Sequence, residues 1–289
     1  MDHSWQIGKV KVTRIVEMEL PIAYYAKKPF MKEATPEALL KMPWLYPNFV
    51  TPEGHLRLSI HALLVEAPGL KLVVDTCVGN DRPRAITANQ ALQTEFLSDL
   101  AAAGWQRESV DFVVCTHLHV DHVGWNTMLE DGQWIPTFPA ARYLIGKQEH
   151  EFWSQHEEAE QVSIMQDSIA PIFEAGLVDL VETDHQISDE IRLLPTIGHT
   201  PGHVSVVIES EGEKAMITGD FIHHPCQIER PEWTVSFDTD EPAAAACRKS
   251  VLEDIADSTV LVIGTHFASP TAGTIVTSGD SYAFVGAQS

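Results

Sequence analysis

A cluster of metal-binding side chains lies near the middle of the sequence. The segment 116–122 reads Thr-His-Leu-His-Val-Asp-His, so the imidazoles of His117, His119 and His122 and the carboxylate of Asp121 lie close together in the chain. In an extended segment alternate residues face the same side, which lets His117 and His119 point together. Neutral imidazoles and carboxylates suit Zn²⁺ and similar divalent ions. A surface histidine cluster is the alternative, but the motif favours a metal site.

Three further motifs place a His or an Asp where an apolar run ends. The segment 196–203 reads Thr-Ile-Gly-His-Thr-Pro-Gly-His and contains His199, Gly219 precedes Asp220, and Gly264-Thr265 precedes His266. Small residues beside a polar one are what close approach to a ligand requires. Each motif alone could be a turn with a capped polar residue. Taken with the first motif, they indicate one site.

Strands are expected immediately before all four motifs, at 112–115, 191–194, 215–218 and 260–263. Further strands are expected at 7–20, 59–67, 71–75, 142–145, 179–181 and 204–209, and helices at 36–42, 89–103, 147–157, 160–174 and 241–256. The strands come in clusters without strict alternation with helices. This pattern favours two sheets covered by helices over one doubly wound parallel sheet. We expect a single domain over 1–289, with a Pro- and aromatic-rich insertion at about 21–58.

Composition narrows the class of protein. The chain has 289 residues and is 44% hydrophobic, with 19 Lys and Arg against 41 Asp and Glu, a net charge of −22. Such an acidic chain would repel nucleic acid and anionic membranes. The four cysteines are scattered, the first residues show no secretory signal, and no apolar run is long enough to span a membrane. A cytoplasmic protein is therefore expected.

The order of these motifs resembles that of the metallo-β-lactamase-fold superfamily of hydrolases. The resemblance runs from Leu72-Val-Val-Asp75-Thr through the His-rich motif, Gly-His and Gly-Asp to Gly264-Thr-His266. It implies a mixed α/β fold (α+β), in which helices and sheets form a four-layer αββα sandwich. It also implies that Asp75 orients a metal ligand without binding metal itself.

The resemblance further implies a dinuclear metal site, most simply with two Zn²⁺ ions. One ion would be bound by His117, His119 and His199, and the other by Asp121, His122 and His266. The carboxylate of Asp220 would bridge both. The same ligands accept Fe, Mn or Co, so the native metal stays open.

The segment 219–227, Gly-Asp-Phe-Ile-His-His-Pro-Cys-Gln, looks most like the branch that contains methyl parathion hydrolase and related lactonases and esterases. This implies cleavage of an ester or lactone bond, with a phosphotriester as a further candidate, by a hydroxide held between the metals. Asp121 would carry a proton to the leaving group, and His223 would donate to the developing oxyanion. Quorum-quenching lactonases commonly have Tyr at the position of His223. A supporting role is the alternative for His223.

Two other functions share this ligand set. One is a thioesterase of the glyoxalase II type, whose members usually carry a basic patch that is not evident in this acidic chain. The other is a non-catalytic metal-binding domain. A small neutral or apolar substrate is expected from the charge. Residues 21–58 could wall a substrate pocket, form the interface of a homodimer, or simply pack over the fold; Trp125, Trp153 and Trp233 are candidates for the pocket or the core.

Overall fold

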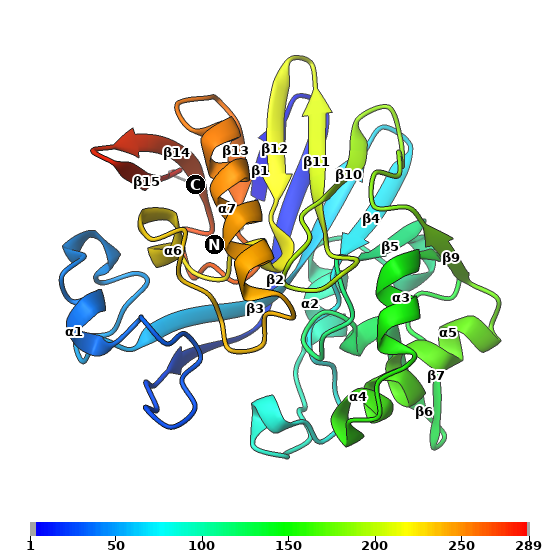
Figure 1. The fold of residues 1–289 in the computed structure, drawn as a ribbon. Coiled ribbons are helices and arrows are strands. Elements are labelled where there is room, and N and C mark those ends of the chain that lie inside the picture. Colours follow the sequence, from blue (N-terminus) through cyan, green and yellow to red (C-terminus); the bar gives the residue numbers. More distant parts are fainter. Residues whose placement is uncertain (1–3, 288–289) are drawn as a thin grey trace. The chain divides into compact units, whose positions relative to one another are not determined.

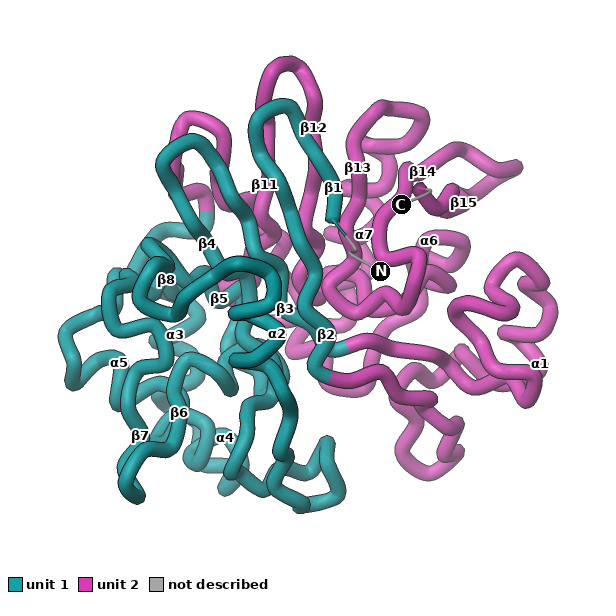
Figure 2. The backbone as a smooth tube through the Cα atoms, turned by 180° about the vertical axis from the view of Figure 1, so that it is seen from behind, with its two compact units in different colours: residues 1–17, 60–183 teal, residues 18–59, 184–289 magenta. Residues whose placement is uncertain are grey.

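The computed structural model describes residues 4–287. The chain divides into two compact units (Figure 2). Unit 1 comprises residues 1–17 and 60–183, and unit 2 comprises residues 18–59 and 184–289. Their elements are labelled in Figure 1. The expectation of a single domain stays a prediction.

Unit 1 is built on a sheet of seven strands in the order β1-β2-β3-β4-β5-β8-β9. Strands β4, β5, β8 and β9 run parallel, so β4 and β5 end at the same edge of the sheet. Asp75 follows β4 at this edge, and the His-rich motif follows β5. The strands are β1 (Ser4–Ile7), β2 (Val10–Ile22), β3 (Leu56–Ala67), β4 (Leu70–Val74), β5 (Phe112–Cys115), β8 (Arg142–Gly146) and β9 (Val178–Val181).

The helices of unit 1 are α2 (Phe96–Ala102), α3 (Lys147–Trp153), α4 (Ala159–Ile164) and α5 (Ala170–Glu174), and a hairpin joins β6 (Thr127–Glu130) to β7 (Gln133–Pro136). Helix α3 packs against β8 and β9; Figure 1 labels α3 and β9. The helix predicted over 89–103 begins only at Phe96, because residues before it pair with an earlier loop through Asn80–Leu92 and Pro83–Ala91 bridges. The helix predicted over 160–174 contains a π-helical turn at Met165–Ile169.

Unit 2 contains a sheet of six strands in the order β10-β11-β12-β13-β14-β15. Only β12 and β13 run parallel; the other neighbours are antiparallel. The strands are β10 (Ile191–Pro195), β11 (Val204–Ser210), β12 (Glu213–Ile217), β13 (Leu261–Ile263), β14 (Ala272–Ser278) and β15 (Ser281–Gly286). The helices are α1 (Pro36–Leu39), α6 (Cys226–Glu229) and α7 (Glu241–Ile255).

Helix α7 covers part of this sheet. The Asp240 side chain caps its first turn by accepting a hydrogen bond from the Ala243 amide at 3.0 Å. Its buried residues, among them Leu252 and Ile255, recur at helical spacing and join the same core as Met216 and Val262. Figure 1 shows the helix, in orange, beside β13.

The Pro- and aromatic-rich segment 21–58 belongs to unit 2. Met31, Leu39, Leu45 and Phe49 are fully or almost fully buried in the core of that unit. Much of the segment therefore packs as core. Tyr25 and Tyr46 are exposed instead. The homodimer expected as one role of this segment stays a prediction.

Most of the expected strands are present, with ends that differ by a few residues. The predicted strand 7–20 is interrupted near Gly8, where the chain turns from β1 into β2, and β2 then runs without a break through Arg14–Val16. Strands β6, β7, β14 and β15 were not predicted. Within residues 4–287, no helix is long and apolar enough to cross a membrane.

Candidate metal centre

In unit 1, Asp75 organises the His-rich loop. Its Oδ1 accepts the Thr116 amide and its Oδ2 accepts the Thr116 hydroxyl, both at 2.8 Å. The same Oδ2 lies 2.9 Å from His122 Nδ1. Because an ionised carboxylate only accepts hydrogen bonds, His122 carries its proton on Nδ1 and presents the lone pair of Nε2. Asp75 thus occupies the orienting position that the resemblance implies.

The other donors of the motif gather in the same loop. His117 Nε2 lies 2.9 Å from His119 Nδ1, and the His117 and His122 rings are 4.0 Å apart between centroids. Asp121 Oδ1 lies 3.6 Å from His122 Nε2. The loop closes as a turn, with the His122 amide donating to the His119 carbonyl at 3.1 Å. The structure therefore brings together all four residues predicted from this motif.

Glu149 and Trp153 of α3 support this loop from the side. Glu149 is buried, and its Oε1 accepts hydrogen bonds from the Leu118 amide at 3.1 Å and from Trp153 Nε1 at 2.6 Å. The Trp153 ring contacts the His119 ring, with centroids 5.1 Å apart. Trp153 is therefore in contact with a predicted ligand, whereas the sequence offered no sign of Glu149.

Glu17 forms hydrogen bonds to one loop that precedes the His-rich motif in the sequence and to one that follows it. Its carboxylate accepts the Val78 amide at 2.8 Å and Trp125 Nε1 at 2.7 Å. Burial raises the pKa of Glu17, and these hydrogen bonds offset part of that shift. Trp125 is also buried and stacks on Phe96, so it packs in the core.

In unit 2, His199 is oriented by Asp238. Its Nδ1 lies 2.7 Å from Asp238 Oδ1, and Asp238 Oδ2 accepts the Val235 amide at 3.0 Å. Burial raises the pKa of Asp238, and the nearby His223 offsets part of this shift. No local motif marks Asp238, so sequence reasoning missed it.

His266 is oriented by the backbone. Its Nδ1 lies 3.0 Å from the carbonyl oxygen of Ser59, and the Ser59 amide donates to the His266 carbonyl, also at 3.0 Å. A carbonyl can only accept, so His266 also carries its proton on Nδ1 and presents the lone pair of Nε2.

One oxygen of Asp220 is surrounded by imidazole nitrogens of unit 2. Oδ2 lies 3.1 Å from Nε2 of His223, 3.2 Å from Nε2 of His266 and 3.7 Å from Nε2 of His199. Asp220 and these imidazoles are almost completely buried. One donor atom from each of His199, Asp220 and His223 lies within 4.8 Å of the others. The structure thus brings the unit 2 residues predicted from separate motifs to one carboxylate.

The neighbours His223 and His224 differ in their contacts. His224 Nε2 donates to the Phe49 carbonyl at 2.8 Å, while its Nδ1 accepts the Cys226 amide at 3.1 Å, so the backbone uses both nitrogens. Burial lowers the pKa of His224 to about 4. By contrast, neither ring nitrogen of His223 has a well-aligned hydrogen-bond partner among the residues the structure describes, although Nε2 lies 3.1 Å from Asp220 Oδ2. The His223 imidazole is therefore available to a ligand, and that of His224 is not.

These donors fit divalent ions. In His122, His199 and His266 the Nδ1 proton is directed to an oxygen acceptor, which is the arrangement that holds metal-binding histidines in proteins. Carboxylates and imidazoles buried without a counter-cation would carry a large desolvation cost. The residues present therefore match a metal centre in both chemistry and orientation.

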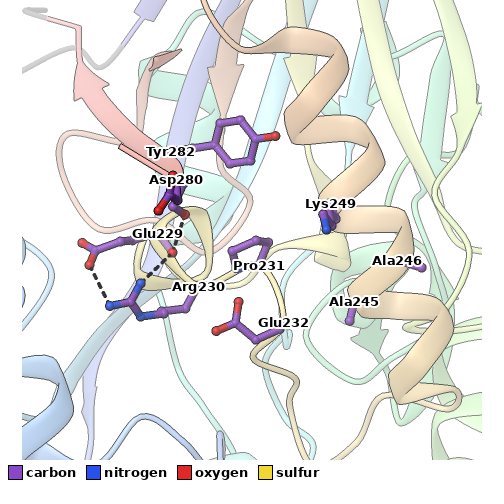
Figure 3. A pocket seen from close by; sticks show the side chains of 10 residues that line it. Glu229, Arg230, Pro231, Glu232, Ala245, Ala246, Lys249, Asp280 and Tyr282 are labelled. Carbon is purple, nitrogen blue, oxygen red and sulfur yellow. Dashed lines mark hydrogen bonds and ion pairs between the residues drawn. The ribbon is translucent and has the colours of Figure 1, made fainter. Parts of the chain in front are cut away.

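A separate hollow of about 400 Å³ in unit 2 contains none of the predicted ligands. Figure 3 shows side chains of both charges on its walls, with the Glu229 carboxylate 3.4 Å from the Arg230 guanidinium. It is lined by Glu229–Glu232, Ala245, Ala246, Lys249 and Asp280–Tyr282. Trp233 is buried beside this region and does not line the hollow.

Residues 56–266 match the family model of the metallo-beta-lactamase superfamily. Since this segment covers well over half of the chain, the protein belongs to that superfamily, as the motifs predicted. Its fold is confirmed by the hydrolase AbOPH of the beta-lactamase superfamily, which has a TM-score of 0.80 and 25% identity over 99% of this chain and 97% of that one. The fold is thus the metallo-β-lactamase sandwich.

Among the relatives, an N-acyl homoserine lactonase from a Bacillus species is 26% identical over 178 residues, which cover 56% of this chain and 63% of the relative. The chain thus matches less than two thirds of the length of the curated relatives. In fold it is also similar to AidC, a dizinc quorum-quenching lactonase solved with its product, with a TM-score of 0.81 and 21% identity over 99% of this chain and 97% of that one.

Proposed function

We propose that this protein is a metal-dependent hydrolase that cleaves a carboxylic ester or lactone. The observation that carries the proposal is the buried Asp220 carboxylate, approached by three imidazole nitrogens in a member of the metallo-β-lactamase superfamily. Two divalent ions, which we propose to be Zn²⁺, are bound by seven ligands: His117, His119, Asp121, His122, His199, Asp220 and His266. The borderline character of imidazole and carboxylate donors supports zinc.

When bound, the two ions lower the pKa of coordinated water and polarise the electrophilic oxygen of the substrate. The protein supplies the remaining steps. His223, which is buried beside Asp220, donates a hydrogen bond to the oxyanion that forms on the substrate. Asp121, which is partly exposed, carries a proton to the leaving group.

We propose a neutral substrate with an apolar part. Phe30 and Phe237 contact each other, with ring centroids 5.2 Å apart, and both contact the ring of His223 at 5.8 and 5.5 Å. Phe237 is 41% exposed although it also touches His199, so an apolar surface lies open beside the proposed ligands. The net charge of −22 disfavours anionic substrates.

Metal analysis combined with a substrate panel tests the proposal. The purified protein is expected to contain close to two divalent ions per chain and to hydrolyse lactones and esters faster than thioesters. Chelation should abolish hydrolysis, and added Zn²⁺ should restore it. Phosphotriesters in the same panel decide whether the activity extends to phosphorus. A protein without bound metal, or one whose preferred substrate is a thioester, would contradict the proposal.

We also propose a cytoplasmic location. The thiols of Cys77, Cys115, Cys226 and Cys247 are all free, as is usual in a reducing compartment. Cell fractionation followed by immunodetection tests this location.

A further inference from the structure

His203 lies at the end of the loop that carries His199, but its ring takes part in a different set of contacts. It is fully buried, and it immediately precedes β11. Its Nε2 accepts a hydrogen bond from the backbone amide of Asp220 at 2.7 Å. An imidazole nitrogen that accepts an amide proton is itself unprotonated, so His203 must carry its proton on Nδ1.

The other ring nitrogen of His203, Nδ1, also has close polar neighbours. His203 Nδ1 lies 3.0 Å from the carbonyl oxygen of Thr196 and 2.8 Å from its hydroxyl oxygen. The Thr196 hydroxyl contacts the Ser205 hydroxyl at 2.9 Å. The Ser205 hydroxyl in turn donates to the Thr218 carbonyl at 2.7 Å. A buried chain of hydrogen bonds therefore joins the ends of β10, β11 and β12 through one neutral imidazole.

Gly219 allows the ring to come this close. Its φ is +57°, which favours glycine, and a Cβ atom at this position would lie 2.6 Å from His203 Nε2. The imidazole thus rests against the bare backbone directly before Asp220. Because the position of the Asp220 backbone sets where its carboxylate can reach, this contact bears on the distances to His199, His223 and His266.

We propose that His203 is a positioning residue that fixes the backbone of Asp220 so that its carboxylate can bind metal. It is not a metal ligand, since a backbone amide occupies its Nε2 and Thr196 lies against its Nδ1. The inference rests on the proposed function, in which Asp220 is a ligand. It assigns a role to a histidine that is not among the seven proposed ligands.

Two substitutions separate the two sides of the ring. In H203Q the side-chain carbonyl can replace Nε2 and accept the Asp220 amide, whereas H203N can replace only Nδ1 toward Thr196. We expect H203N to bind Zn²⁺ about 10–100-fold more weakly than the wild type in competition with a chelator. H203Q should bind within a few-fold of the wild type. At saturating metal, kcat of H203N should fall while KM changes little.

A matched control is His224, which is equally buried in unit 2 and also bonded to the backbone through both nitrogens, but without contact to Asp220. H224N should lose stability as H203N does, by the midpoint of thermal unfolding, yet keep the zinc affinity of the wild type. Hydrogen exchange of the Asp220 amide in metal-free protein provides a readout that is independent of activity. It should be faster in H203N than in H203Q.

The outcomes separate this inference from the proposed function. If the wild type binds no divalent ion, the proposed function is wrong and the inference falls with it. If the wild type binds zinc and H203N binds it equally tightly, only the inference is wrong. It is also wrong if H203Q is impaired as strongly as H203N, or if H224N loses zinc affinity to the same degree.

Discussion

The predicted ligands of unit 1 and those of unit 2 are organised in opposite ways. In unit 1 they lie in one loop, and a single carboxylate, Asp75, holds both the start of that loop at Thr116 and its end at His122. In unit 2 they come from separate loops, and each histidine has its own anchor: Asp238 for His199 and the Ser59 carbonyl for His266, which are 39 and 207 residues away in sequence. Loss of Asp75 should therefore disturb several predicted ligands of the unit 1 loop, whereas loss of Asp238 should disturb the orientation of His199 alone.

The largest effect is expected at the residue on which the unit 2 ligands converge. Asp220→Ala removes the carboxylate that three imidazoles approach, so it should abolish metal binding and lower kcat by more than the roughly 100-fold typical of residues that only orient ligands. The fold should survive, because Asp220 lies in a short turn after β12. Metal content, hydrolysis and circular dichroism check these points. An active variant with a full complement of metal would overturn the dinuclear assignment.

The next largest effect is expected at His223, whose Nδ1, unlike that of His199 or His266, has no oxygen acceptor among the described residues. His223→Phe should lower kcat about 100–1000-fold, as expected for the loss of one oxyanion donor, without releasing metal. His223→Tyr keeps a donor group and should retain more activity than His223→Phe. Turnover and metal content are measured for both variants. Unchanged turnover in the Phe variant would show that His223 has no part in the reaction.

The two anchoring carboxylates, Asp75 in unit 1 and Asp238 in unit 2, can be compared directly by substitution. Asp75→Asn and Asp238→Asn should each weaken metal binding about 10–100-fold. Asp75→Asn should in addition lower the free energy of unfolding of the metal-free protein by about 1–3 kcal/mol more than Asp238→Asn, because Asp75 accepts two further hydrogen bonds, from the amide and the hydroxyl of Thr116, whereas Asp238 accepts one, from the Val235 amide. Chelator competition and denaturant titration measure the two quantities. Equal loss of stability in both variants would contradict the difference drawn between the units.

A pH dependence is expected from His224, a buried histidine of unit 2 that is not among the proposed ligands. Burial lowers the pKa of His224 to about 4 in the folded state, while an unfolded histidine titrates near 6.5. Between these values the unfolded chain binds the proton and the folded one does not, so stability is lost as the pH falls. The loss approaches about 1.4 kcal/mol per pH unit. His224→Gln in metal-free protein should flatten the fall between pH 6.5 and 4; an unchanged slope would assign the effect to other groups.

The smallest effect is expected at the exposed aromatic surface beside the unit 2 ligands. Phe237→Ala should raise KM several-fold for substrates with long apolar chains and leave short-chain substrates almost unchanged. Tyr25→Ala, at another exposed aromatic residue of unit 2, is the matched control. A KM that does not depend on chain length in Phe237→Ala would remove the support for an apolar substrate.

The difference between residues grouped in one motif and residues brought together by folding explains what could be predicted from the sequence. The ligands of the unit 1 loop form one short motif, and buried strands end at that motif and before His199, Asp220 and His266, so these residues could be identified without a structure. Asp238 and Glu149 could not, because an isolated carboxylate in a loop or helix has no distinguishing neighbours in sequence. Their roles depend on tertiary contacts with Nδ1 of His199 and with the Leu118 amide.

Errors in the predicted elements have local causes. The strands β14 and β15 are rich in β-branched and aromatic residues and flank a Ser-Gly-Asp turn, which is the sequence pattern of a hairpin. The helix expected from 89 onward was overridden by pairing with residues near Asn80, where the Thr94 amide donates to Asn80 Oδ1 at 2.7 Å. Apolar spacing alone could not reveal this competing partner.

The anchor of His266 has a consequence for how the protein tolerates change. Its acceptor is the carbonyl of residue 59, so no substitution of the Ser59 side chain removes it. What would remove it is a shift in the alignment of β3, since one inserted residue before position 59 would bring a different backbone group to His266. The orientation of His266 is therefore insensitive to a substitution that changes only the Ser59 side chain, and sensitive to an insertion or deletion in the strand before it. Ser59 itself is buried, so its side chain is constrained by packing, and the length of the strand before it is constrained by the contact with His266.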